Sequence, residues 1–231
     1  DDDLGWSPPE FSRLLTLFAK HDQKLNAAAI PHGLSDESIR ESIPYSYQAA
    51  PFLQVVTHGF CHQNHEATGK KTEFGPSRSR EEVAAELEQG RRLLESRFEN
   101  YFPCFVPPWN RFHESFLPLL PAAGFKMLSR DETPGKARAP LPEFDVCLDL
   151  HTGKSPERLS AKAVFRQLAE RQEQGFDSAG VMLHHNRMTE EDFSILDDLL
   201  REFSKRGIAS CFFSDMLPGS ERRREIEVTH V

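Results

Sequence analysis

The sequence predicts an α/β fold built on a parallel sheet, either open or closed into a barrel. Three observations support this prediction. Apolar, β-branched segments alternate with segments of helical periodicity, as in successive strand–helix–strand units. The 231 residues, with 18 phenylalanines among them, are enough to bury a sizeable core. No repeat or low-complexity stretch interrupts the pattern, so we predict one domain at residues 1–217 and a polar tail at 218–231.

The first elements follow from the spacing of apolar residues. A helix is expected at residues 9–19, after two prolines, because apolar residues recur there at intervals of three and four. A short buried strand follows at 24–31 and ends at a proline. The clearest strand is 52–57 (FLQVVT), which is apolar and β-branched and leads directly into His58. We also expect a short strand to have preceded the acidic residues that open the sequence.

The clearest helix is expected at residues 79–97. Ser79 caps this helix, and Glu82 stands three residues later, as in a capping box. A strand at 104–106 stops at two prolines. The remaining predicted elements are helices at 113–123, 159–173 and 190–205, strands at 125–128, 146–150, 181–183 and 208–213, and a loop rich in proline and glycine at 131–143.

Composition excludes several classes of partner and location. The net charge of −8 argues against nucleic-acid binding, which needs a basic face. No apolar run approaches the roughly 20 residues of a membrane span, and the sequence does not open with a signal-peptide pattern. The four cysteines are scattered and form no CxxC pair, which favours a reducing compartment over a disulfide framework. We therefore expect a cytoplasmic protein.

Residues that bind metals and move protons follow several predicted strands. In parallel α/β proteins the chemistry lies at the C-terminal ends of the strands. The residues expected at those ends are Asp2 and Asp3, His58, residues 107–111, His151, and the pair His184 and His185. This coincidence is the main functional signal in the sequence.

His58 and His62 are four residues apart, so both lie on one face if the segment forms a helical turn. That spacing suits a single metal ion, and His65 adds a third candidate ligand. The alternative is a helix N-terminus whose histidines are satisfied by hydrogen bonds.

The acidic residues that open the sequence supply a carboxylate for the same site. Crowded carboxylates repel one another unless a cation or hydrogen bonds compensate. One carboxylate with two imidazoles leaves a coordination position open for water, which is typical of catalytic zinc. A second carboxylate beside them can act as a general base. For Asp1 we favour a solvent-exposed position.

Two further segments contain groups suited to catalysis. Pro107 and Pro108 fix the backbone and lack N–H groups, so the amides that follow can point into a cleft and stabilise an oxyanion. A rigid turn with Trp109 packed on the surface is the alternative. His184 ends an apolar strand and is suited to act as a general acid near neutral pH. It can equally form a hydrogen bond with a neighbouring loop.

In this order the motifs resemble those of the NodB-homology polysaccharide deacetylases, carbohydrate esterase family 4. The corresponding motifs here are Asp2-Asp3, His58-x-x-x-His62, Pro107 to Arg111 and Leu183-His184. The chain is also similar to a bacterial subgroup with HGxxHxNH, KxEFG, PPWNR, DLHT and HH motifs, found here at residues 58–65, 71–75, 107–111, 149–152 and 184–185. The resemblance runs from Asp2 to about Met188.

The resemblance implies a distorted (β/α) barrel of about seven parallel strands that binds Zn²⁺ or another divalent ion. It implies Asp3, His58 and His62 as metal ligands, Asp2 as the base and His184 as the acid, with the Trp109 amide donating to the oxyanion. A register shifted by one, with Asp1 and Asp2, fits the same pattern. We add Asp149 as a residue that orients His184, and we expect the substrate to contact Pro108, Asn110 and Arg111.

The function implied is hydrolysis of the acetamide of an N-acetylated sugar or polysaccharide. Trp109 and Phe60 offer flat faces to a sugar ring, although core packing is the usual role of a single aromatic residue. The sequence departs from the wider family at Leu4, where the family has glycine, and at Gly59, where it has serine or threonine. The arginine that precedes the family's proline is absent. Two alternatives are a zinc hydrolase acting on another amide or ester, and a glycan-binding domain without turnover.

Overall fold

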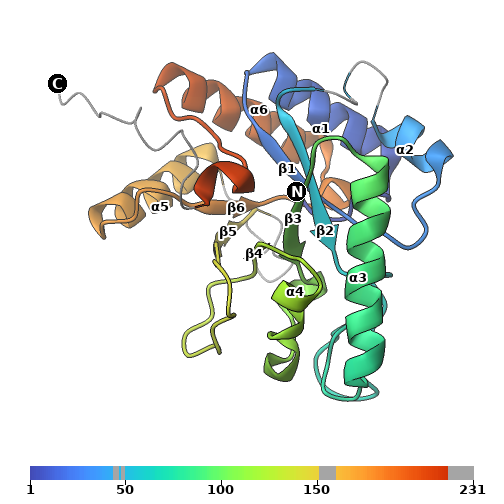
Figure 1. The fold of residues 1–231 in the computed structure, drawn as a ribbon. Helices are drawn as coiled ribbons and strands as arrows, with labels where there is room; N and C mark the ends of the chain where they lie inside the picture. Colours follow the sequence, from blue (N-terminus) through green and yellow to red (C-terminus); the bar gives the residue numbers. More distant parts are fainter. Residues whose placement is uncertain (44–46, 48–49, 151–159, 218–231) are drawn as a thin grey trace.

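The computed structural model describes residues 1–43, 47, 50–150 and 160–217. Within them, six strands form two sheets in which every pairing is parallel. The first sheet has the order β1-β2-β3-β4 and consists of Leu25–Ala29, Leu53–His58, Tyr101–Val106 and Met127–Leu128 (Figure 1). The second pairs β5, Val146–Asp149, with β6, Gly180–Met182. The predicted α/β class is therefore confirmed, with six strands in place of about seven in this part of the chain.

Backbone hydrogen bonds connect the two sheets on both sides. After β4, Glu132 N donates to Val146 O at 3.0 Å, which joins this segment to β5. On the other side, Asp2 N donates to Leu183 O at 3.0 Å, and Ala28 N donates to Asp1 O at 2.8 Å. Residues 1–4 thus lie between β1 and the end of β6, where a seventh strand would stand, and close an irregular ring.

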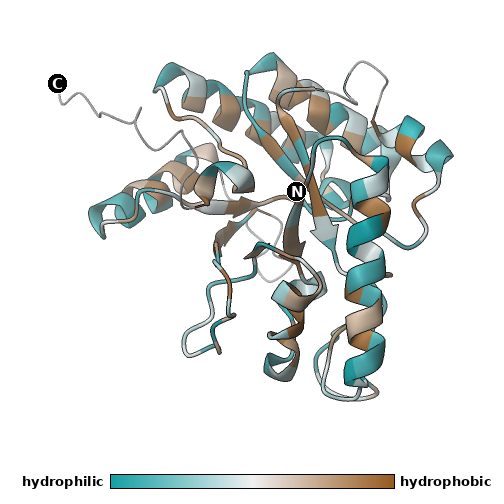
Figure 2. Cartoon of the chain, in the orientation of Figure 1, coloured by the Kyte–Doolittle hydropathy of each residue, from teal (hydrophilic) through white to brown (hydrophobic). Residues whose placement is uncertain are grey.

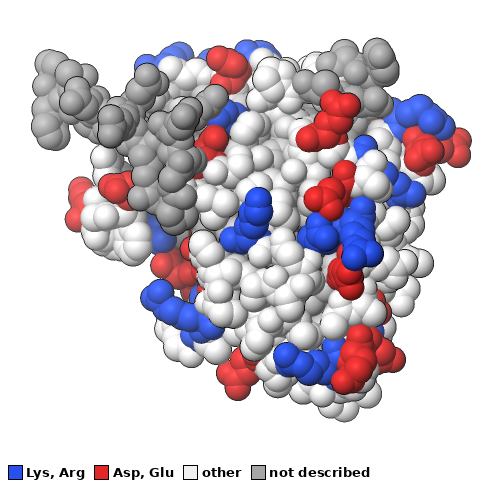
Figure 3. Space-filling view, in the orientation of Figure 1, with Lys and Arg blue, Asp and Glu red and all other residues white. Residues whose placement is uncertain are grey.

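Helices cover the outside of this ring. They are α1 (Pro8–Lys20), α2 (Asp36–Ser42), α3 (Arg80–Arg97), α4 (Leu119–Ala122), α5 (Ala161–Glu173) and α6 (Glu190–Lys205). Helices α1 and α6 lie side by side (Figure 1), and their apolar faces bury against β1 and β2. Apolar residues concentrate in the strands and on the inner faces of the helices (Figure 2). Acidic and basic side chains both gather over α3 (Figure 3). Within this helix, Arg92 forms an ion pair with Glu88.

The two faces of the first sheet bury different side chains. Alternate residues along β1 and β2, such as Ala27 and Val55, face the helical layer. Their neighbours Ala28 and Val56 point to the other side, where they pack with apolar side chains of β3 and β4. Because all of these strands run parallel, their C-terminal ends lie at the same rim of the ring.

Capping residues and proline account for where several helices begin and break. Helix α3 begins at the predicted capping box, in which Ser79 Oγ accepts from Glu82 N at 3.2 Å. The helix predicted at 113–123 is wrong: Pro118, which has no N–H group, stands between a 3-10 turn at Glu114–Phe116 and the short α4. Helix α2 was not predicted, because its short sequence shows little apolar periodicity.

The strand predicted at 208–213 is also wrong. This segment lies next to β1. The free edge of β1 already forms backbone hydrogen bonds with residues 1–4, so it is not available to another strand. Side chains provide the contacts instead: Gln23 Oε1 accepts from Ser210 N at 2.9 Å, and Asn26 Oδ1 accepts from Phe213 N at 3.1 Å. The predicted tail at 218–231 lies outside the described residues. Among the residues described, no helix is both long and apolar enough to span a membrane.

Candidate active site

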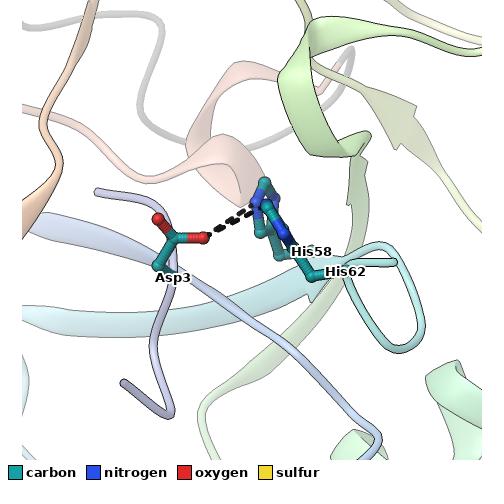
Figure 4. Close-up of side chains that lie close together, drawn as sticks. All are labelled: Asp3, His58 and His62. Carbon is teal, nitrogen blue, oxygen red and sulfur yellow. Dashed lines mark ion pairs between the residues drawn. The ribbon is translucent and has the colours of Figure 1, made fainter. Parts of the chain in front are cut away.

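Three of the predicted ligands converge at the C-terminal rim of the first sheet. Asp3 Oδ1 lies 3.4 Å from His58 Nε2 and 3.4 Å from His62 Nε2 (Figure 4). All three ligand atoms lie within 4.8 Å of one another. Metal–ligand bonds of about 2.0–2.1 Å in a tetrahedron place neighbouring ligand atoms roughly 3.4 Å apart. The two carboxylate–imidazole distances therefore fit a single tetrahedral divalent ion.

Other groups aim the free atoms of Asp3 and His58 at this point. His58 Nδ1 lies 3.1 Å from the Val106 carbonyl oxygen, which can only accept, so Nδ1 carries the hydrogen and Nε2 keeps its lone pair. Asn186 Nδ2 donates to Asp3 Oδ2 at 3.0 Å. The other oxygen, Asp3 Oδ1, is buried and accepts no hydrogen bond from the residues described. A buried carboxylate oxygen of this kind is costly without a cation, so the site fits a divalent metal.

The electrostatics of the cluster also suit a cation. Burial acts to raise the pKa of Asp3, but the facing imidazoles hold it well below its usual range. Burial acts to lower the pKa of His58, yet the charges of Asp2 and Asp3 outweigh it and raise this pKa. A position that favours a proton in this way also favours a metal ion, which replaces that proton.

A loop, and not the predicted helical turn, brings His58 and His62 together. His58 ends β2, and the chain then turns through two left-handed residues, Gly59 at φ 62° and His62 at φ 54°. A Cβ at residue 59 would lie 2.1 Å from Glu73 Oε2 and 2.6 Å from Pro108 Cγ, so only glycine fits. This explains the glycine that departs from the wider family. His65, the third candidate ligand, is exposed and lies outside the cluster.

The three aspartates lie in different positions. Asp3 clusters with His58 and His62, and Asp2 Oδ2 lies 4.0 Å from His184 Nε2. Asp1 is not exposed as predicted, because its side chain is fully buried and pairs with His185 Nδ1 at 2.8 Å. The geometry thus matches the register in which Asp2 and Asp3 are the functional pair.

His184 lies between two carboxylates. Its Nε2 faces Asp2, and its Nδ1 lies 3.7 Å from Asp149 Oδ1, as expected if Asp149 orients the ring. Burial lowers the pKa of His184, although Asp2 and Asp149 act in the opposite direction. The His151 and Thr152 positions of the same motif lie outside the described residues.

The Pro107–Arg111 segment forms a 3-10 turn at Pro108–Asn110 against the cluster, and the Trp109 ring lies 4.5 Å from that of His62. Trp109 and Asn110 adopt left-handed φ values of 56° and 58°. The Asn110 and Arg111 amides bond within the turn, so of these three amides the Trp109 amide remains the proposed oxyanion donor.

The side chains of Pro108, Asn110 and Arg111 lie in different surroundings. Pro108 is buried, and Asn110 Nδ2 lies 3.9 Å from Met182 Sδ. The Arg111 guanidinium donates to Lys71 O at 2.8 Å, which ties it to the loop before α3. Phe60 is buried in the core, so it offers no face to a sugar.

Three residues of the site have no role in the sequence interpretation. Asn186 bonds Asp3, Glu73 bonds the loop that holds His62, and Trp6 lies 4.8 Å from the His62 ring. Trp6 is 43% exposed, while its carbonyl is held by His185 Nε2 at 2.8 Å. Of these three residues, only Glu73 could have been found from the sequence, because it belongs to the KxEFG motif. The contacts of Trp6 and Asn186 depend on the tertiary fold.

No protein-family model matches the chain, and no curated protein sequence matches it. Solved structures do match. They include a carbohydrate esterase family 4 pseudoenzyme from Bacillus anthracis (15% identity, TM-score 0.59), of which a mutant has restored enzymatic activity. The alignment covers 94% of this chain and 63% of that pseudoenzyme, so the chain spans less than two thirds of its length.

Two further structures are similar over more of their length. One is a family 4 carbohydrate esterase from Streptomyces lividans, with 9% identity and a TM-score of 0.59; the alignment covers 91% of this chain and 88% of that one. The other is a peptidoglycan deacetylase from Bacillus subtilis, with 12% identity and a TM-score of 0.58; the alignment covers 93% of this chain and 85% of that one. At these identities the likeness concerns the fold, which agrees with the barrel that the sequence resemblance implies. The chain has the fold of the family 4 carbohydrate esterases.

Proposed function

We propose that this protein is a metal-dependent deacetylase that hydrolyses the acetamide of an N-acetylated sugar or polysaccharide. The observation that carries the proposal is the Asp3–His58–His62 cluster with Asp2 and His184 beside it. When bound there, zinc or a similar divalent ion lowers the pKa of water and stabilises negative charge on a carbonyl oxygen. Proteins with this fold include a peptidoglycan deacetylase and a carbohydrate esterase in complex with acetate, which supports the choice of substrate.

The protein's own residues divide the proton transfers between them. Asp2 accepts the proton of the attacking water, and His184 donates a proton to the leaving amine nitrogen. Asp149 faces the other ring nitrogen of His184 and holds the ring in the orientation needed for this donation. The Trp109 amide donates to the oxygen of the carbonyl under attack.

The test is acetate release from purified protein reconstituted with Zn²⁺. The substrates are oligomers of N-acetylglucosamine, peptidoglycan fragments, O-acetylated xylan fragments and simple acetamides. We expect release from the N-acetylated sugars and its loss after chelation, with recovery when Zn²⁺ is restored. Release only from simple amides or esters would favour a different zinc hydrolase. Glycan binding with metal present but no acetate release would favour a binding domain, as in a pseudoenzyme.

Trp6 is expected to form one wall of the sugar site. Its exposed indole lies against the ligand His62, so a pyranose whose acetamide reaches the metal can pack on it. For Trp6→Ala we expect KM for the N-acetylated sugar to rise about tenfold, equivalent to ~1.4 kcal/mol of lost binding, with a smaller change in kcat. The control is Phe176→Ala, which removes an equally exposed aromatic residue (44%) outside the cluster. An unchanged KM for Trp6→Ala would contradict this role.

A further inference from the structure

Glu73 holds the loop that carries His62. Three consecutive amides point at its carboxylate: Phe60 N lies 3.2 Å from both oxygens, while Cys61 N and His62 N donate to Oε1 at 2.6 Å and 3.1 Å. The Cys61 thiol adds a contact at 3.2 Å. Successive backbone N–H groups that converge in this way form a nest for an anion. Here the anion is a side chain of the protein itself.

The Glu73 carboxylate occupies a space shaped for it. The residue is fully buried, and burial raises its pKa although the amides of the loop oppose this. Buried carboxylates are costly unless hydrogen bonds satisfy them, and the three amides do so. The absence of a side chain at Gly59 leaves room for Oε2, since a Cβ would approach it to 2.1 Å.

Glu73 is itself rigidly anchored. The next residue, Phe74, is fully buried in an aromatic cluster, with ring centroids 5.6 Å from Phe105 and 5.5 Å from Phe112. Phe105 belongs to β3, and Phe112 follows the turn that contains Trp109. Glu73 therefore links the irregular loop at residues 59–62 to the sheet, through its hydrogen bonds to the loop and the packing of its neighbour Phe74 on β3.

We propose that Glu73 is a positioning residue for the metal ligand His62. Its carboxylate fixes the backbone of residues 60–62, and this directs His62 Nε2 at Asp3 Oδ1. The inference rests on the proposed metal site. Glu73→Gln keeps the size of the side chain but loses the charge and presents an NH₂ group to amide donors. Loss of such an outer-shell partner typically weakens metal binding by about 10- to 100-fold, and we expect Glu73→Gln to fall in this range.

A double-mutant cycle separates positioning of His62 from general support of the fold. Zn²⁺ affinity is measured by calorimetry for the wild type, Glu73→Gln, His62→Ala and the double variant, at protein and metal concentrations high enough to measure the weak binding that two ligands retain. We expect Glu73→Gln to weaken binding in the wild type but to have little further effect once His62 is absent. The matched control is Glu66→Gln, because Glu66 lies in the same loop and accepts from Ser77 N, at 3.0 Å, in place of the 60–62 amides. It should bind Zn²⁺ as the wild type does.

A second readout needs no metal. The chain's two tryptophans, Trp6 and Trp109, both lie against His62, at 4.8 Å and 4.5 Å between ring centroids. Release of His62 should therefore change the tryptophan emission and its quenching by acrylamide in metal-free Glu73→Gln, and leave Glu66→Gln unchanged. This measurement still tests the Glu73–His62 link if the wild type binds no zinc, a result that would instead overturn the proposed function.

Two outcomes would overturn the role of Glu73. One is wild-type Zn²⁺ affinity and emission in Glu73→Gln. The other is an equal loss of affinity in the presence and absence of His62, which would show that Glu73 supports the fold as a whole. Should Glu73→Gln fail to fold, Glu73→Asp enters the same cycle, because it keeps the charge but withdraws it by one methylene. We expect Glu73→Asp to weaken Zn²⁺ binding when His62 is present and to have no further effect in His62→Ala.

Discussion

Asp2→Asn is expected to lower kcat for acetate release by about 10²- to 10⁴-fold while the protein keeps its metal. Asp2 is buried, and its Oδ2 lies 4.0 Å from His184 Nε2, but it is not among the three clustered ligands. Asparagine has the same shape and cannot accept the proton of the attacking water. Only the proton transfer should therefore be lost.

The measurement for Asp2→Asn combines kcat on an N-acetylglucosamine oligomer with metal content by elemental analysis. Asp22→Asn provides the matched control, since Asp22 is an exposed aspartate in the turn before β1 and should keep full activity. Full acetate release by Asp2→Asn would exclude Asp2 as the base. Loss of both metal and activity would instead make Asp2 a ligand.

His58→Ala is expected to lower the metal content from about one ion per chain to almost none. The His58 imidazole is buried, and its Nε2 is one of only three protein ligand atoms in the described cluster. Two ligands, Asp3 and His62, would remain, and catalytic zinc sites typically need three protein ligands. Acetate release should fall to background at the same time.

Elemental analysis of protein dialysed against a chelator-free buffer containing Zn²⁺ tests this expectation. His65→Ala is the informative control, because His65 belongs to the same sequence motif but is exposed and outside the cluster. It should retain the ion. Equal metal content in wild type and His58→Ala would show that the ion binds elsewhere.

Much of the fold could be predicted because its signals are local. The apolar spacing of α1, the capping box of α3 and the β-branched residues of β2 each determine an element without reference to distant residues. The segment at 208–213 has equally apolar residues but is not a strand. Its state depends on whether the edge of β1 is free, and residues 1–4 already occupy that edge.

The candidate site shows the same limit. The strand-end rule placed His58 and His184 correctly at the rim, because parallel strands bring their C-terminal ends together. The conformation between His58 and His62 could not be predicted, since a four-residue spacing suits both a helical turn and a left-handed loop. The loop is determined by Glu73, and a contact across more than ten residues leaves no periodic pattern in the sequence.

The closure of the ring by residues 1–4 has a consequence for how the protein folds. Asp2 N bonds Leu183 O, and Asn186 bonds Asp3 across 183 positions, so the two sides of the site come from segments that are far apart in the sequence. Contacts of such long range form late in folding, since a large loop must close first. A chain that ends before Leu183 would lack the backbone hydrogen bond that closes the ring and the Asn186 side chain that bonds Asp3. The geometry around Asp3 is therefore complete only after segments 183 positions apart in the sequence have met.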